Sequence, residues 1–115
     1  MTEELDKAFE LANLMTVVSN QKMALLEEFE QSTLFFHNGG CFKIDQLLIS
    51  FLTSLKDLNQ NSVVLLDTNN LPIRIDNLES FRKDAIIRYF EASNKYLTGY
   101  QAIKNNKQIK SILEL

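Results

Sequence analysis

The sequence has little of the residues that build metal sites, cross-links and chain breaks. Its 115 residues include one cysteine, one proline, one histidine, three glycines and no tryptophan. The single cysteine, Cys41, excludes an internal disulfide and a cysteine-rich zinc site. We therefore expect a chain of a reducing compartment that binds no metal and no cofactor.

Positive charge and long apolar runs are also scarce. The net charge is −3 and the pI is about 5.1, so the basic surface of a typical DNA-binding domain is missing and nucleic-acid binding is disfavoured. No apolar run approaches the roughly 18 residues that suggest a membrane helix. The first residues include Glu3, Glu4 and Asp6, unlike the basic start of a secretory signal. We expect a soluble intracellular protein with no membrane partner.

The apolar content and its periodicity predict one α+β domain over 1–115. Hydrophobic residues make up 45% of the chain, enough for one ordinary core. The pattern predicts two long helices and one medium helix with a small three-stranded sheet, built from a β-hairpin and one short strand. The expected elements are a long helix over 2–36, a strand over 41–44, a helix over 45–58, a hairpin over 63–75, a long helix over 77–104 and a tail helix over 107–114.

The hairpin and the helix after it form the best-defined stretch. Residues 63–66 are apolar and begin with two β-branched valines, and residues 67–70 are Asp-Thr-Asn-Asn, which favour a tight turn. Pro72 cannot donate to a sheet ladder, so we expect its strand at an edge. Asp76 is the expected N-cap of the next helix, with Glu79 as its capping-box partner.

The N-terminal helix has apolar residues on more than one face between positions 8 and 18, so it needs cover on more than one face. Whether the polar residues 19–22 break this helix is left open, although the lack of Gly and Pro favours a continuous helix. We expect Asn38-Gly39-Gly40 to end the helix as left-handed C-cap residues.

The strand over 41–44 is followed by a helix that Asp45 caps, and then by the strand over 63–67. A βαβ unit normally pairs its strands in parallel. Whether strands 41–44 and 63–67 do so is left open here. The expected strand order is 41–44, 63–67, 71–75.

The two long helices suggest self-association. Each would be about 40–45 Å long, whereas a compact domain of this length is roughly 34 Å across. Antiparallel packing would bring the acidic end of the first helix to the basic early turns of the last helix, that is, Glu27, Glu28 and Glu30 to Arg82, Lys83 and Arg88. It would also bring the acidic N-terminus toward Lys95, Lys104 and Lys107, so the charges favour antiparallel packing. We expect a homodimer.

No motif for catalysis stands out, and we expect a protein that is not an enzyme. His37 and Cys41 are four residues apart, but a nucleophile and its base also need a rigid frame and an oxyanion pocket. Residues 67–70 resemble the start of a calcium loop, yet Leu71 stands where a further ligand belongs and no Glu closes the loop. Structural roles are favoured for all of these residues.

Three tyrosines on the last long helix, Tyr89, Tyr96 and Tyr100, have the spacing of core or interface residues rather than of a base-stacking platform. Apolar stripes without cover inside the chain favour contact with another protein. The residues expected at this interface are Leu11, Leu14, Val17, Val18, Tyr96, Tyr100, Ile109, Ile112 and Leu113.

Three segments resemble proteins of one viral group. They are NGGCFKIDQLLISFL, VVLLDTNNLPIRIDNLESF and YFEASNKYLTGYQAIKNNKQIKSILEL, and they are similar to small uncharacterised proteins of marine cyanobacterial phages with contractile tails. The resemblance implies a phage protein in the host cytoplasm or the virion, but it implies no site residue.

Within that resemblance the expected function is a non-enzymatic minor virion or virion-assembly component, bound to phage structural or assembly proteins. One alternative is a regulator that binds a host or phage enzyme during infection. A second alternative is a small enzyme with an unrecognised site.

Overall fold

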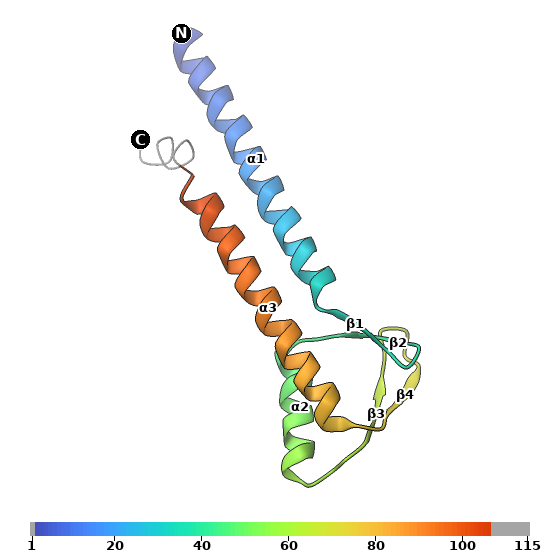
Figure 1. The fold of residues 1–115 in the computed structure, drawn as a ribbon. Helices are drawn as coiled ribbons and strands as arrows, with labels where there is room; N and C mark the ends of the chain where they lie inside the picture. Colours follow the sequence, from blue (N-terminus) through green and yellow to red (C-terminus); the bar gives the residue numbers. More distant parts are fainter. Residues whose placement is uncertain (1, 107–115) are drawn as a thin grey trace. The chain divides into compact units, whose positions relative to one another are not determined.

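The computed structural model describes residues 2–106, which fold as an α+β protein with three helices and two separate two-stranded sheets (Figure 1). The α+β class is confirmed, but the expected single three-stranded sheet is wrong. The elements in chain order are α1 (Thr2–Ser32), β1 (Leu34–His37), β2 (Gly40–Lys43), α2 (Gln46–Asp57), β3 (Val63–Leu66), β4 (Pro72–Ile75) and α3 (Leu78–Lys104).

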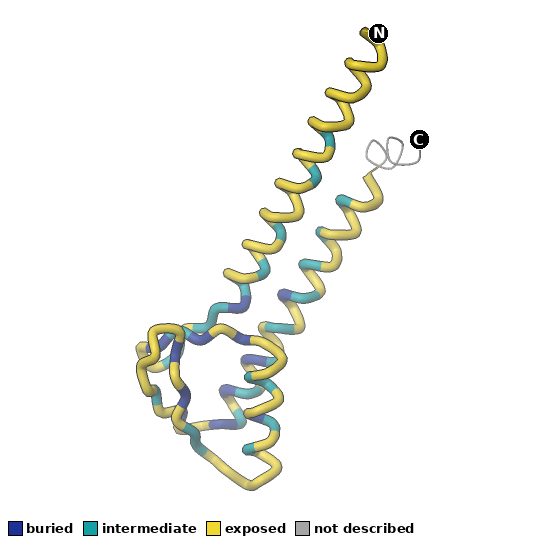
Figure 2. Tube along the Cα trace, turned by 180° about the vertical axis from the view of Figure 1, so that it is seen from behind, coloured by how far each residue is buried: buried dark blue, intermediate teal, exposed yellow. Residues whose placement is uncertain are grey.

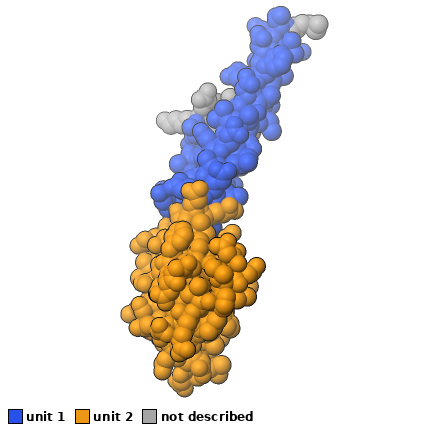
Figure 3. All heavy atoms as spheres, turned by 90° about the vertical axis from the view of Figure 1, so that its right-hand side faces the viewer, with its two compact units in different colours: residues 1–29, 94–115 blue, residues 30–93 orange. Residues whose placement is uncertain are grey.

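The chain divides into two compact units, which Figure 3 colours separately. Unit 1 combines residues 1–29 with residues 94–115, and unit 2 comprises residues 30–93. Unit 1 therefore contains most of α1 and the end of α3, whereas unit 2 contains both sheets, α2 and the start of α3. The single domain stays a prediction, and the expected tail helix over 107–114 lies outside the described residues.

The first sheet is a β-hairpin whose first strand was expected to be the end of the N-terminal helix. The helix expected over 2–36 ends at Ser32, because residues 34–37 pair antiparallel with β2. Asn38 and Gly39 have φ angles of 49° and 79°, the left-handed geometry of a two-residue hairpin turn. They do not cap a helix; they turn the chain between β1 and β2.

The second sheet, β3–β4, is the expected hairpin, and it pairs with no other strand among the described residues. Its antiparallel register places Val63 opposite Ile75 and Leu66 opposite Pro72. The expected neighbourhood of strands 41–44 and 63–67 in one sheet, whose parallel pairing was left open, is wrong, because β2 takes β1 as its partner. Both strands of a two-stranded sheet are edge strands, so the edge position of Pro72 is confirmed.

A side chain, rather than a strand ladder, links the two hairpins. The Oδ1 atom of Asp67 accepts hydrogen bonds from the backbone N–H groups of Asn69 and Leu71, both at 2.9 Å. Its Oδ2 atom accepts from the backbone N–H of Cys41 at 3.2 Å, and the Thr68 N–H donates to the Cys41 carbonyl at 2.8 Å. The Asp67 carboxylate, which is buried, thus closes its own turn and holds the neighbouring hairpin.

The core of unit 2 surrounds Phe81 of α3. The Phe81 ring meets the rings of Phe35 and Phe42 edge to face, each with centroids 5.4 Å apart, a favoured aromatic geometry. Strands, α2 and α3 all contribute to this core (dark blue in Figure 2). Its buried members are Phe42, Ile44, Leu52, Leu65, Ile75, Leu78, Phe81 and Ala85.

The ends of α2 are both capped by side chains or turns that the sequence encodes. Asp45 is its N-cap, as expected, and its Oδ1 accepts from the Leu48 N–H at 2.7 Å. At the other end Asn59 has a φ of 61°, while the Gln60 N–H donates to the Leu55 carbonyl at 3.0 Å. This is the Schellman arrangement, in which Asn substitutes for the usual Gly.

The start of α3 lies one residue later than expected. The Oδ1 atom of Asn77 accepts from the Ser80 N–H at 3.0 Å, so Asn77 is the N-cap and the expected Asp76 cap is wrong. Asn and Asp cap helices about equally well, and Asp76 instead accepts from the Arg74 Nε at 2.9 Å. Glu79 does not close a capping box; its carboxylate binds two cations.

Helix α1 is continuous from Thr2 to Ser32, and the polar residues 19–22 do not break it. None of its residues is buried (Figure 2). Since α1 is also rich in large apolar side chains, it carries apolar surface that the described chain leaves in contact with solvent.

Candidate functional site

Unit 1 is an antiparallel pair of helices, formed by residues 2–29 of α1 and the end of α3. Glu28 forms an ion pair with Lys95 at 2.6 Å, and the Lys22 ammonium lies 5.4 Å from the centroid of the Tyr100 ring. Residue numbers fall along α1 as they rise along α3, which is the direction that the charge pattern predicted. The expected approach of Lys95 to the acidic N-terminus is wrong, because Lys95 contacts Glu28 instead.

The two helices approach each other closely at Gly99. A Cβ atom at this position would lie 2.6 Å from the Cδ2 of Leu25, so the end of the Leu25 side chain occupies the space that a side chain at position 99 would need. Tyr96 packs edge-on against Phe29 with ring centroids 5.2 Å apart, and it stacks on Tyr100 at 6.5 Å. The tyrosines are packed on their own chain rather than displayed as a free stacking platform.

A groove of about 510 Å³ runs along one side of this helical pair. Among the described residues that line it, Lys22 is the only charged one. The other lining residues are Leu14, Met15, Val18, Ser19, Met23, Leu26, Tyr96 and Tyr100. An apolar groove with adaptable methionines is typical of surfaces that receive another protein segment.

The groove collects part of the interface expected from the sequence. Leu14, Val18, Tyr96 and Tyr100 all line it. Two further expected residues, Leu11 and Val17, lie on α1 outside the groove with 38% and 48% of their surface exposed. The remaining expected residues, Ile109, Ile112 and Leu113, lie outside the described part of the chain.

The most exposed apolar residues of the groove were not among those expected at the interface from the sequence. Met15, Met23 and Leu26 are 59%, 58% and 44% exposed. Their spacing continues along α1 on both sides of Ser19, a position that was read only as part of a polar interruption. Reading the helix face through Ser19 would have found them.

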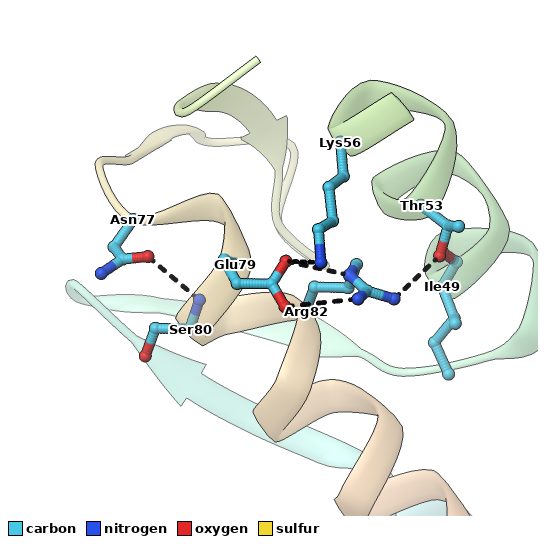
Figure 4. Close-up of polar contacts among 7 residues, drawn as sticks. All are labelled: Ile49, Thr53, Lys56, Asn77, Glu79, Ser80 and Arg82. Atoms are coloured by element: carbon cyan, nitrogen blue, oxygen red, sulfur yellow. Dashed lines mark hydrogen bonds and ion pairs between the residues drawn. The ribbon is translucent and has the colours of Figure 1, made fainter. Parts of the chain in front are cut away.

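Unit 2 carries a polar cluster that links α2 to α3 (Figure 4). The Glu79 carboxylate binds the Lys56 ammonium at 2.9 Å and the Arg82 guanidinium at 3.3 Å. Arg82 also donates to the Thr53 hydroxyl at 3.4 Å. A cleft of about 620 Å³ lies beside Lys56 and Glu79 and is lined mainly by polar side chains.

The hydrogen bond from Lys56, with that from Arg82, lowers the pKa of Glu79 below its ordinary value. A carboxylate with a lowered pKa is a weak proton acceptor at neutral pH, so this geometry serves as an ion pair rather than as general acid–base machinery. Half-exposed pairs of this kind orient two helices more than they stabilise them.

The other candidate residues take structural places. The backbone N–H of Leu71 contributes most to lowering the pKa of Asp67, burial opposes it, and the N–H groups of Cys41 and Asn69 lower it further. The Asp67 carboxylate accepts hydrogen bonds from backbone N–H groups, as expected for a turn residue. The His37 ring stacks on Phe35 at 5.9 Å. Across residues 2–106, no group of three or more His, Cys, Asp or Glu side chains is arranged to hold a metal ion.

Comparison with known proteins identifies no relative of this chain. No protein-family model, curated protein or solved structure matches the chain. Among the described helices, none has the length and apolar character needed to cross a bilayer. The groove of unit 1 is therefore the strongest candidate site on the evidence of its own residues.

Proposed function

We propose that the protein is a non-enzymatic interaction protein that works through contacts with other proteins. The observation that carries this proposal is α1, a helix of 31 residues with no buried residue and with large apolar side chains exposed along its length. Exposed apolar surface of this extent marks a surface that another molecule covers.

The chemistry of the groove supports a protein partner over a small polar molecule. Leu14, Val18 and Leu26 offer aliphatic contacts, and Met15 and Met23 can adjust to the side chains of an incoming helix. Lys22 is engaged with Tyr100, which leaves the groove with few polar groups to orient a small ligand. An amphipathic helix is the segment that such a groove receives best.

The resemblance of three segments to proteins of marine cyanobacterial phages supports a role in infection. We propose a minor virion or virion-assembly component, present in the host cytoplasm or in the particle, with phage structural or assembly proteins as partners. A regulator of a host or phage enzyme is the competing role, and the identity of the captured partner decides between the two.

The test is affinity purification of the tagged chain from infected host cells, with partners identified by mass spectrometry. The wild-type chain is compared with Met23→Glu, which places a charge in the groove, and with Asn13→Glu. Asn13 is exposed on the same helix and does not line the groove, so this variant controls for charge and helix propensity. We expect wild type and Asn13→Glu to recover virion or assembly proteins and Met23→Glu to lose them.

Two outcomes contradict the proposal. Recovery of no partner by the wild-type chain would contradict an interaction protein and favour a small enzyme. Recovery of a host or phage enzyme would contradict the virion and assembly role and favour the regulator.

A further inference from the structure

The exposed face of α1 has a symmetric spacing of small and apolar side chains. Ala12, Met15, Ser19, Met23 and Leu26 follow one another at spacings of three, four, four and three residues, so they share one helix face. All five are exposed. We call this set the α1 stripe.

The α1 stripe is symmetric about Ser19. Met15 and Met23 lie four residues to either side of it, and Ala12 and Leu26 lie seven residues to either side. A two-fold axis through Ser19 would therefore place Met15 against Met23 of a second copy and Ala12 against Leu26 of that copy. In a two-fold interface residue i contacts residue j and j contacts i, which is the relation that this spacing provides.

We propose that the α1 stripe binds a second copy of this chain, with the two α1 helices antiparallel and Ser19 on the two-fold axis. This inference deepens the proposed function, because it names one protein that covers the groove. With the end of α3 from each copy, the pair forms a four-helix bundle, in which two helical pairs bury the apolar faces that one pair leaves exposed.

Side-chain sizes are compatible with this pairing. Small Ala12 faces large Leu26, and the two serines at the centre allow the helix axes to approach to about 8–10 Å. The flexible methionines fill the space on either side of the serines.

The surface available is enough for a dimer that dissociates on dilution. Phe9, Met15, Met23, Leu26 and Tyr100, on or beside the stripe, are between 38% and 60% exposed. They offer on the order of 500 Å² per copy, and the resulting total of about 1,000 Å² is the lower limit for a specific interface.

The first experiment measures the mass of the full chain by sedimentation and light scattering, from nanomolar to high micromolar concentration. We expect the 13.3 kDa chain to double its mass at the higher concentrations. Ser19→Glu should raise the dissociation constant by about a hundredfold, because it places two like charges together on the axis. Asn20→Glu, at the next position and also exposed, should leave the dimer intact.

A charge-swap experiment tests the axis directly. Ser19→Glu and Ser19→Lys should each be monomeric alone, and an equal mixture should form a dimer of one chain of each kind. Circular dichroism of each variant checks that the helices are retained. A mixture that stays monomeric while both variants remain helical would overturn the placement of Ser19 on the axis.

Cysteine cross-linking tests the direction of the helices, in a Cys41→Ser background that removes the native thiol. A mixture of Met15→Cys and Met23→Cys chains should form a disulfide between unlike chains, and Met15→Cys alone should not cross-link. Cross-linking of Met15→Cys alone would contradict the antiparallel arrangement and favour a parallel one.

A chain that stays monomeric at every concentration, or a dimer that Ser19→Glu does not weaken, overturns the inference. Both results concern the purified chain, so they leave the proposed function standing with a different protein in the groove. Loss of every partner in infected cells, with the dimer intact, would instead remove the proposed function and leave the pairing.

Discussion

The two units of this chain use similar amounts of apolar sequence in opposite ways. Unit 2 gathers its apolar side chains around Phe81, which is 1% exposed, and eight residues form its buried core cluster. In unit 1 no described residue is buried, although Phe9, Met15 and Met23 are large and apolar. In unit 2 strands, α2 and α3 together enclose a core. Two paired helices share only one face, so they can bury apolar side chains only along that face.

The two units differ in where their stability comes from. Unit 2 obtains it from its own burial, from the Asp67 link between hairpins and from capped helix ends. Unit 1 obtains little from inside the chain, so a partner that covers its apolar surface would stabilise it by mass action. Substitutions in each unit test this difference.

The same substitution should have effects of very different size in the two units. Phe81→Ala removes a ring that contacts Phe35, His37 and Phe42 and should lower the free energy of unfolding by about 3–5 kcal/mol. Phe9→Ala, at a side chain 60% exposed, should change it by less than about 0.5 kcal/mol in the monomer. Urea denaturation at low protein concentration measures both, and equal losses would contradict the contrast between the units.

The second prediction concerns the link that unit 2 has and unit 1 lacks. Asp67→Asn replaces an acceptor at the Cys41 N–H with an amide group that has one acceptor oxygen instead of two, so we expect a loss of stability smaller than that of Phe81→Ala. Exposed Asp84→Asn is the matched control. Urea denaturation again gives the values.

The Asp67 link also predicts a pH dependence. Its pKa in the folded chain lies below the ordinary value of 3.8, so the stabilisation is present above that value and is lost as pH falls through the folded pKa. Wild type should therefore lose more stability than Asp67→Asn when the pH is lowered from neutral to below 3.8. An identical pH dependence in the two proteins would show that the carboxylate does not hold the hairpins.

The sequence predicted those features of unit 2 that depend on nearby residues. The turn at Asp67, the cap at Asp45 and the β3–β4 hairpin each follow from a few adjacent side chains. The β1–β2 hairpin was missed because Asn38-Gly39 can end a helix or turn a hairpin, both of which use left-handed backbone. The partner of each strand depends on distant residues, and a βαβ pattern does not decide it.

The candidate site was only partly predictable for a related reason. Leu14, Val18 and Tyr96 stood out as apolar residues at helical spacing, but the sequence does not say which face of α1 lies against α3. In the structure that face is marked by the close approach of the Leu25 side chain to Gly99. Once this face is known, Met15 and Met23 are left exposed and the groove is defined.

Helix α1 has no basic residue in its last turn. A side chain of α3 instead donates hydrogen bonds to backbone carbonyls at and just after the end of α1. Arg88 donates to the carbonyls of Ser32 at 3.5 Å and Leu34 at 3.2 Å, and its guanidinium lies 5.1 Å from the Phe35 ring centroid. Arg88→Met should cost about 1 kcal/mol of unfolding free energy.

Arg88→Lys provides the control for this substitution, since an ammonium can donate to one carbonyl but stacks less well on an aromatic ring. It should recover part of the loss in the same denaturation experiment. Equal stability of the Met and Lys variants would show that side-chain packing, rather than donation to the carbonyls, accounts for the effect.

The smallest effect is expected at the closest contact of unit 1. Gly99→Ala should gain about 0.8–1 kcal/mol of helix propensity, but its new Cβ would lie 2.6 Å from the Leu25 Cδ2. Leu25 can move the end of its side chain because the surrounding unit is only half-buried, so the two terms should cancel to within about 0.5 kcal/mol. Denaturation of the monomer measures the balance. A loss as large as that of a core substitution would show that unit 1 is packed as rigidly as unit 2, which would remove the contrast between them.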